Sequence, residues 1–312
     1  MTPATSPVAS GAGSLADRAI LSIAGSDPSG GAGLQADLKT FTALGVYGAA
    51  AITCITVQNT LGVRYFTPLA PQLVHDQIRA VLEDLPVSHV KIGMLGTPEI
   101  ALAVAAALAD FAGEVIYDPV LVAGAGQSLC RGGAGGEIPV LQEKLLAKVS
   151  VLTPNLPELA ALAGRETADL APVADAPPTA IVAAVRELFQ RYPRLRAVAL
   201  TGAHHQPASA LIRDFLLQRP PLEAEPGSAS GSLGEQDLTE IRHVRRQSNN
   251  LHGTGCTFAA ALAVHHQLTG SYPEALQRTV AFLDRVIAAG RPLQLGKGNG
   301  PLGHHLYHPP AT

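Results

Sequence analysis

The segment His252-Gly253-Thr254-Gly255-Cys256-Thr257 combines residue types that could act on an anion. Its glycines let backbone N–H groups approach a charged oxygen closely, and an Ala-rich helical stretch follows at once over Phe258–Leu268. The start of a helix adds unpaired N–H groups and a partial positive charge, so the turn predicts a phosphate site. A cysteine there is expected to have a lowered pKa and to remove a proton or stand beside a reacting phosphoryl group. The alternative is a glycine turn that only caps a buried helix.

A second glycine-rich loop, Ala24–Gly33, lies between a strand-like run and a helical one. It contains neither G-x-G-x-x-G nor a Walker lysine, which argues against a dinucleotide site and a P-loop. The carboxylate of Asp27 suits a hydroxyl or ring N–H donor better than it suits a phosphate. The alternative is a tight turn in which Asp27 bonds its own backbone.

A third polar segment, Thr153–Glu158, reads Thr-Pro-Asn-Leu-Pro-Glu. Asn155 could cap a helix that carries Glu158 at its third position, which is the pattern of a capping box. The same pair could orient Mg²⁺ through water, because this ion keeps several waters and takes few carboxylates. Asp118, which follows a predicted strand, is a further candidate for contact with a metal or with phosphates.

The elements that must position these residues alternate along the chain. Strands are expected over Ala19–Ala24, Ala49–Val57, His89–Leu95, Glu114–Tyr117, Val149–Leu152, Arg196–Leu200, Ala210–Leu217 and Glu240–Arg246. Helices are expected over Gly33–Leu44, Pro71–Leu85, Glu99–Phe111 and Ala180–Tyr192. This alternation predicts right-handed crossovers and a mainly parallel sheet covered on both faces. Ligands bind beyond the carboxyl ends of such strands, which is where Asp27, Gln58, Asp118, Asn155 and Thr201 fall.

The composition limits the classes of function. The chain has 312 residues and a net charge of −3 with 4% aromatic residues, which argues against a nucleic-acid-binding surface and a polybasic membrane anchor. No apolar run approaches the roughly 18 residues of a membrane span. Three cysteines without a C-x-x-C motif argue against a disulfide framework and a cysteine zinc site, and favour the reducing cytoplasm.

The chain is expected to form one domain over residues 18–312, after a disordered tail over residues 1–17 that is rich in small residues and proline. Residues 218–237 are low in apolar residues and predict a surface insertion. Three histidine pairs are expected on the surface or at caps, since neighbours on a helix point about 100° apart and make poor paired ligands. These pairs are His204-His205, His265-His266 and His304-His305.

Taken together, the segments resemble the hydroxymethylpyrimidine and phosphomethylpyrimidine kinases of thiamine biosynthesis, members of the ribokinase-like fold. The resemblance covers roughly residues 20–308, and its segments keep the family's order and spacing. They are Ile23–Gly48, Val57–Val63, Lys91–Leu95, Asp118–Ala123, Leu152–Glu158 and His252–Thr257. The resemblance implies an α/β fold, a three-layer αβα sandwich with a central, mainly parallel sheet.

The resemblance also implies roles for residues around a substrate. Gln58 and Asp27 match positions that bind the aminopyrimidine, and Met94 matches one that lines the ring pocket. Cys256 matches the position of the catalytic base. The anion hole beside it corresponds to Gly253, Thr254 and Gly255.

A nucleotide side of the site is implied in the same way. The family's magnesium and phosphate motif corresponds to Asn155 and Glu158, which would reach the ion through water. Further contacts to the nucleotide or its phosphates correspond to Asp118, Thr201 and Gly202. The implied cofactors are ATP and Mg²⁺. The implied reactions are phosphorylation of 4-amino-5-hydroxymethyl-2-methylpyrimidine and then of its monophosphate to the diphosphate, and a homodimer is expected.

Two departures from the family pattern keep other functions open. The family usually has a lysine where this chain has Thr201, and often has one in the loop that here reads Ala123-Gly124-Ala125-Gly126. A pyrimidine-sensing module without turnover would explain their loss. A kinase of the same fold acting on pyridoxal, pyridoxine or pyridoxamine is the nearest alternative. A hydrolase with Cys256 as nucleophile has little support, because no His–Asp pair is placed to activate it.

Overall fold

The computed structural model describes residues 18–120, 143–170, 178–202, 210–219 and 237–309. Within these ranges nine strands form one sheet in the order β3-β2-β1-β4-β5-β6-β7-β8-β9. The strands are β1 (Ala19–Ser26), β2 (Tyr47–Asn59), β3 (Gly62–Pro68), β4 (Val87–Ile92), β5 (Glu114–Tyr117), β6 (Val151–Leu152), β7 (Ala197–Leu200), β8 (Leu211–Gln218) and β9 (Leu238–Val244). From β2 through β7 the pairing is parallel, and the outer strands β3, β8 and β9 pair antiparallel.

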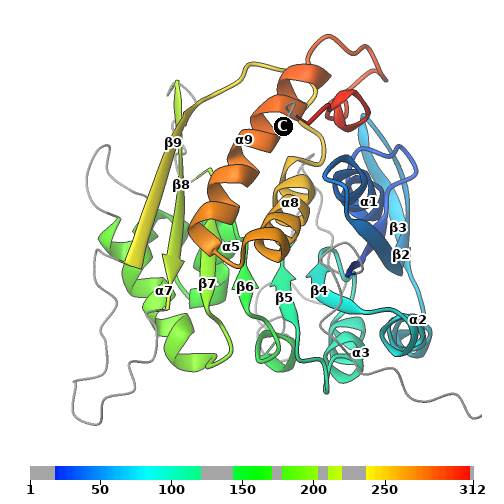
Figure 1. Ribbon diagram of the computed structural model, residues 1–312, viewed down its shortest axis with the longest axis vertical. Coiled ribbons are helices and arrows are strands. Elements are labelled where there is room, and N and C mark those ends of the chain that lie inside the picture. The colour runs from blue at the N-terminus through cyan, green and yellow to red at the C-terminus, as the bar shows by residue number, and fades with distance from the viewer. Residues whose placement is uncertain (1–17, 121–142, 171–177, 203–209, 220–236, 310–312) are drawn as a thin grey trace, which may run out of the picture.

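Helices cover both faces of the sheet, as the alternation of elements predicts (Figure 1). The helices are α1 (Gly33–Ala43), α2 (Pro71–Asp84), α3 (Pro98–Ala107), α5 (Leu156–Ala163), α6 (Thr167–Leu170), α7 (Thr179–Arg191), α8 (Thr254–Thr269) and α9 (Tyr272–Gly290), with the short 3₁₀ helix η3 (His304–Leu306) near the end. The expected αβα sandwich with a mainly parallel sheet is therefore confirmed.

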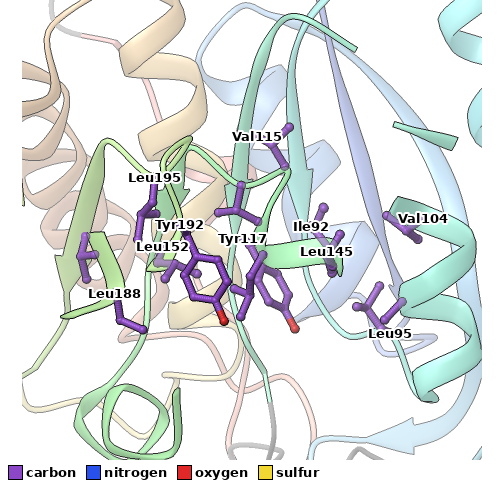
Figure 2. Packing of buried hydrophobic residues seen from close by; sticks show 14 of the residues in the cluster. Ile92, Leu95, Val104, Val115, Tyr117, Leu145, Leu152, Leu188, Tyr192 and Leu195 are labelled. Carbon is purple, nitrogen blue, oxygen red and sulfur yellow. The ribbon is translucent and has the colours of Figure 1, made fainter. Parts of the chain in front are cut away.

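Each face of the sheet has its own core. Successive side chains of a strand point to opposite faces, so Ile20 packs with α1, α8 and α9, whereas Leu21 packs with α2 and α3. Figure 2 shows part of the larger core, in which Tyr117 and Leu152 from neighbouring strands lie close to Tyr192. Both cores are almost wholly apolar and hold the strand ends in fixed positions.

Local signals explain several boundaries. Thr97 caps α3 by accepting a hydrogen bond from Ile100 N, and Pro98 occupies the first turn as expected. The strand β3 was not expected. It forms because the chain reverses after Asn59, with Gly62 at φ 135°, and it pairs only with β2. The expected tail and nearly all of the insertion 218–237 lie outside the described residues.

The surface location expected for the histidine pairs is wrong for two residues. His265 and His304 are buried, and their rings hydrogen-bond the hydroxyls of Thr279 and Thr257 at 3.1 and 2.9 Å. Each hydroxyl satisfies one ring nitrogen of its histidine, which lowers the cost of burying the ring. The pair His204-His205 lies outside the described residues. Among the helices described, none has the length and apolar character needed to span a membrane.

Candidate active site

A cavity of about 300 Å³ opens where the parallel strands end and α8 begins. It is lined by residues at the ends of β1, β2, β4, β5, β6 and β7. Open α/β sheets bind ligands at this edge. The residues predicted from sequence line it together: Asp27, Gln58, Met94, Asp118, Asn155, Glu158, Thr201, Gly253, Thr254, Gly255 and Cys256. Gly202 does not, and its N–H donates to Asp214 Oδ1 at 2.8 Å.

The glycine turn before α8 is shaped by close backbone contact. Gly253 has φ +86°, and a side chain there would collide with the carbonyl oxygen of Gly31. As the N-cap, Gly253 supplies no side-chain acceptor to the first turn of this 16-residue helix. Thr254 N already donates to Leu251 O at 3.3 Å, so the N–H groups of Gly255 and Cys256 and the positive end of the helix dipole are the groups offered to the cavity, as an anion hole requires.

The Cys256 thiol lies in the cavity wall near the N–H of Gly33, which donates to it. Burial raises the pKa of Cys256 to about 12, although the positive charge of Lys91 acts in the opposite direction. The prediction of a lowered pKa is wrong, because removal from water outweighs the charge at the helix start. The resting site therefore holds a thiol, not a thiolate.

Asp118 follows β5 and presents a carboxylate to the cavity. Its Oδ2 atom is buried and has no hydrogen-bond partner among the described residues. A side-chain carbon on Gly255 would lie 3.9 Å from that oxygen, so the carboxylate faces the start of α8. Burial raises the pKa of Asp118 to about 6, while Lys91 lowers it. A buried carboxylate oxygen in a ligand cavity without a partner is suited to a cation.

A buried ion pair lies beneath these groups. Lys91 Nζ on β4 is 2.9 and 3.0 Å from the two carboxylate oxygens of Asp37 on α1, and Ser22 Oγ donates to Asp37 Oδ2 at 2.6 Å. Burial disfavours the charged form of Lys91, but Asp37 more than offsets this, so the pKa of Lys91 is raised and the ammonium stays charged. Sequence reasoning missed both residues, although a lysine inside an apolar strand was a signal.

Asn155 and Glu158 form the expected capping box at the start of α5. Asn155 Oδ1 accepts from Glu158 N, and Glu158 Oε2 accepts from Asn155 N, each at 2.9 Å. Both side chains also line the cavity. No cluster of three metal-ligating side chains occurs in the described part of the chain. A magnesium ion here would depend mainly on Asp118, on water and on substrate phosphates, which is how Mg²⁺ is commonly held.

The Asp27 carboxylate is surrounded by donors from its own loop. It accepts from Ser29 N and Oγ, from Gly31 N and from Ala32 N, at 2.7 to 3.1 Å. It also lies 2.9 Å from His252 Nε2. Burial raises the pKa of Asp27, but these hydrogen bonds outweigh it and bring the pKa to about 2. Most hydrogen bonds of Asp27 are therefore those of a tight turn that bonds its own backbone, which is the alternative considered from the sequence.

The rest of the cavity wall combines polar side chains with an apolar surface. The Gln58 amide lies 3.0 Å from the same His252 nitrogen, and Thr56 and Asn299 are further polar lining residues. Met94 packs with Cys54 and Phe66, which gives an apolar surface of a size that suits a flat ring. Sequence reasoning did not single out His252, whose only signal was its place at the head of the glycine motif.

Comparison with known proteins shows the family of the chain. The sequence profile of the family described as phosphomethylpyrimidine kinase matches residues 27–303. The chain belongs to the phosphomethylpyrimidine kinase family. It is 39% identical to the hydroxymethylpyrimidine/phosphomethylpyrimidine kinase of Rhizobium meliloti, over 92% of this chain and 96% of that one. The Escherichia coli enzyme of the same name is 36% identical over 92% of this chain and 97% of its own length.

Solved structures extend the family relationship to a second kind of kinase. The pyridoxal kinase of Staphylococcus aureus, solved with AMP-PCP and pyridoxal, superimposes with a TM-score of 0.71 at 28% identity. The match covers 93% of this chain and 95% of that structure. That protein holds a nucleotide analogue and a heteroaromatic alcohol together in one fold.

Proposed function

We propose that this protein transfers the γ-phosphoryl group of ATP to 4-amino-5-hydroxymethyl-2-methylpyrimidine, and then phosphorylates the resulting monophosphate to the diphosphate. The observation that carries the proposal is that one cavity joins the anion-binding start of α8 to the amide of Gln58 and the apolar side chain of Met94. The family relatives carry the names of these activities.

The substrate half of the cavity has the chemistry of an aminopyrimidine site. The Gln58 amide offers one donor edge and one acceptor edge, which match a ring nitrogen and an amino group side by side. The surface of Met94, Val63 and Val120 can contact the ring faces. In this arrangement the hydroxymethyl group points toward the start of α8.

The phosphate half supports transfer by alignment and charge neutralisation. The acceptor oxygen forms a bond to the γ-phosphorus while the bond to the β-phosphate oxygen breaks, and ADP leaves. The N–H groups of Gly255 and Cys256 at the start of α8 stabilise the transferring oxygens. The Cys256 thiol positions the acceptor hydroxyl by hydrogen bonding, since it is protonated at rest. The hydroxyl proton leaves with the transferred group or to solvent, because a loose transition state needs little base.

Magnesium would be held by Asp118, with Glu158 and Asn155 reaching it through water, and would neutralise the phosphate charge. We also propose that Thr201 contacts the nucleotide from the end of β7, where it lines the cavity. A homodimer and a location in the cytoplasm stay predictions from the sequence.

Incubation of the full chain with the hydroxymethylpyrimidine and Mg-ATP, followed by mass analysis, tests the proposal. We expect ADP together with the monophosphate and the diphosphate. Binding of the pyrimidine without ADP release would instead favour a sensing module. A reaction without ATP or magnesium would favour a hydrolase.

Pyridoxal is the second candidate substrate, because the Staphylococcus aureus relative binds it in the same fold. Parallel steady-state assays with pyridoxal and the pyrimidine separate the two. A preference of about 100-fold for pyridoxal, about 2.7 kcal/mol in transition-state binding, would overturn the pyrimidine assignment.

A further inference from the structure

One ring nitrogen of His252 faces two partners at once. Its Nε2 atom lies 2.9 Å from Asp27 Oδ2 and 3.0 Å from Nε2 of the Gln58 amide. An imidazole nitrogen carries either a proton or a lone pair in a given state, so it cannot accept from one partner while it donates to the other. The identity of the two partners therefore determines which state is present.

Asp27 requires the proton to be on His252. Its carboxylate already accepts from the N–H groups of Ser29, Gly31 and Ala32, which only an ionised carboxylate can do fully. Hydrogen bonds from these backbone donors favour the ionised form of the carboxylate independently of the state of His252. An ionised carboxylate can only accept, so the nitrogen beside it must donate.

A protonated Nε2 on His252 has no lone pair to offer an amide NH₂. The contact with Gln58 is favourable only when the amide carbonyl oxygen occupies the position next to the ring, and the two ends of an amide exchange by a half-turn about its last bond. We propose that Asp27 and His252 act as positioning residues, which fix the Gln58 amide with its oxygen toward His252 and its NH₂ toward the ring of the substrate.

The His252 ring is held firmly enough to impose this orientation. Its backbone N–H donates to Gly300 O at 3.0 Å, and the residue forms a parallel bridge with Pro301. The ring packs on Gly31 so closely that a side chain there would collide with it. The side chain of His252 is 15% exposed and that of Asp27 is 3% exposed, so water competes little for their hydrogen bond.

The orientation has a consequence for specificity, which rests on the proposed function. A 4-aminopyrimidine offers an amino N–H beside a ring nitrogen that accepts. The fixed amide donates from its NH₂ to the ring nitrogen, and the second lone pair of its oxygen accepts from the amino group. The 4-oxo analogue, 5-hydroxymethyl-2-methylpyrimidin-4-one, presents the reverse order of acceptor and N–H donor, so both contacts become repulsive.

The variant His252→Phe tests this, because it keeps the flat ring and removes the nitrogen. The measurement is the ratio of kcat/KM for the 4-amino substrate to kcat/KM for the 4-oxo analogue. We expect this ratio to be at least about tenfold lower in the variant than in the wild type, because the Gln58 amide can then rotate by a half-turn and present its oxygen or its NH₂ to either compound. A loss of packing alone would lower both values and leave the ratio unchanged, and that result would overturn the proposal.

The variant His305→Phe is the matched control, because it makes the same substitution at an exposed position. It should keep the wild-type ratio. Should the wild-type chain phosphorylate neither compound, the proposed function fails as well, which is distinct from an unchanged ratio in an active enzyme.

A measurement on the wild-type chain covers the case in which His252→Phe does not fold. Nitrogen-15 spectra of histidine-labelled protein at neutral pH report which ring nitrogen bears a proton. We expect a protonated Nε2 on His252, with the signal assigned by its loss in His252→Gln. An unprotonated Nε2 on His252 would overturn the proposal.

Discussion

The ammonium of Lys91 lies 2.9 Å from a carboxylate oxygen of Asp37, and both side chains are completely buried. The pair joins β4 to α1 directly beneath the cavity, and the positive charge of Lys91 acts on both Cys256 and Asp118. Asp37 acts on both groups in the opposite direction but more weakly, so the pair leaves a residual positive potential below the phosphate site while neither charge is exposed to water.

Loss of the ammonium alone should be costly. The variant Lys91→Met keeps an unbranched side chain of similar size but leaves the buried Asp37 carboxylate without its charge partner. We therefore expect the free energy of unfolding to fall by about 3–5 kcal/mol. Urea denaturation measures this. The double variant Lys91→Met/Asp37→Leu should recover part of the loss. A single variant that costs less than about 1 kcal/mol would show that the pair is not held as described.

Cys256 should react slowly as a nucleophile. Because burial raises the pKa of its thiol to about 12, iodoacetamide at pH 7.5 should modify it far more slowly than it modifies free glutathione. Peptide mass spectrometry measures the rate. The variant Cys256→Ser should bind ATP almost normally with a reduced kcat, and an unchanged kcat would restrict the residue to packing.

Truncation of Gln58 should weaken pyrimidine binding. The variant Gln58→Ala removes both polar edges of the amide, and we expect a loss of about 1–3 kcal/mol in binding, which is the cost of unpaired polar partners. Isothermal titration with the hydroxymethylpyrimidine measures it, with ATP titration as the control. Unaltered pyrimidine affinity would place the ring elsewhere.

Replacement of Asp118 should lower the activity and raise the stability of the protein. The variant Asp118→Asn removes a charge whose burial raises its pKa to about 6, so the wild-type chain loses stability as the pH rises from about 4 through 6. We expect the variant to gain thermal stability at pH 7.5, with a gain that disappears near pH 4. Its kcat should fall at least about tenfold, and it should need more magnesium. Normal activity would contradict the role of Asp118.

Two buried histidines should make the protein sensitive to acid. Burial lowers the pKa of His265 and of His304 to about 4, whereas each titrates near 6.5 when unfolded. The unfolded chain therefore binds more protons between these values, and the free energy of unfolding should fall as the pH drops from 6.5 to 4, by up to about 3 kcal/mol per histidine. The variant His265→Gln should flatten this slope, while exposed His305→Gln should not.

Short-range patterns in the sequence predicted most of the fold. The buried run at Ala19–Ala24 and the spacing of the following helix needed only local periodicity. The capping box at Asn155 and Glu158 was equally local. The strand β3 was missed because only one of its residues is buried at the sheet edge, so its sequence has no buried period of its own.

The cavity could be predicted only in part. Residues at strand ends, such as Asp118 and Thr201, follow from the rule for parallel sheets. The contact between His252 and Asp27 spans 225 positions, so no local pattern reveals it. The direction of the Cys256 pKa shift depends on how deeply the folded chain buries the thiol, and the helix start alone gave the wrong sign.

The contacts that shape the anion-binding turn reach into the last described segment of the chain, where Gly300 O accepts from His252 N and His304 bonds Thr257. During synthesis on a ribosome, this turn is translated well before those partners have left the exit tunnel. A chain that stops short of these partners, whether nascent or truncated, can still build most of the sheet, but its anion-binding turn lacks the contacts that hold it in place.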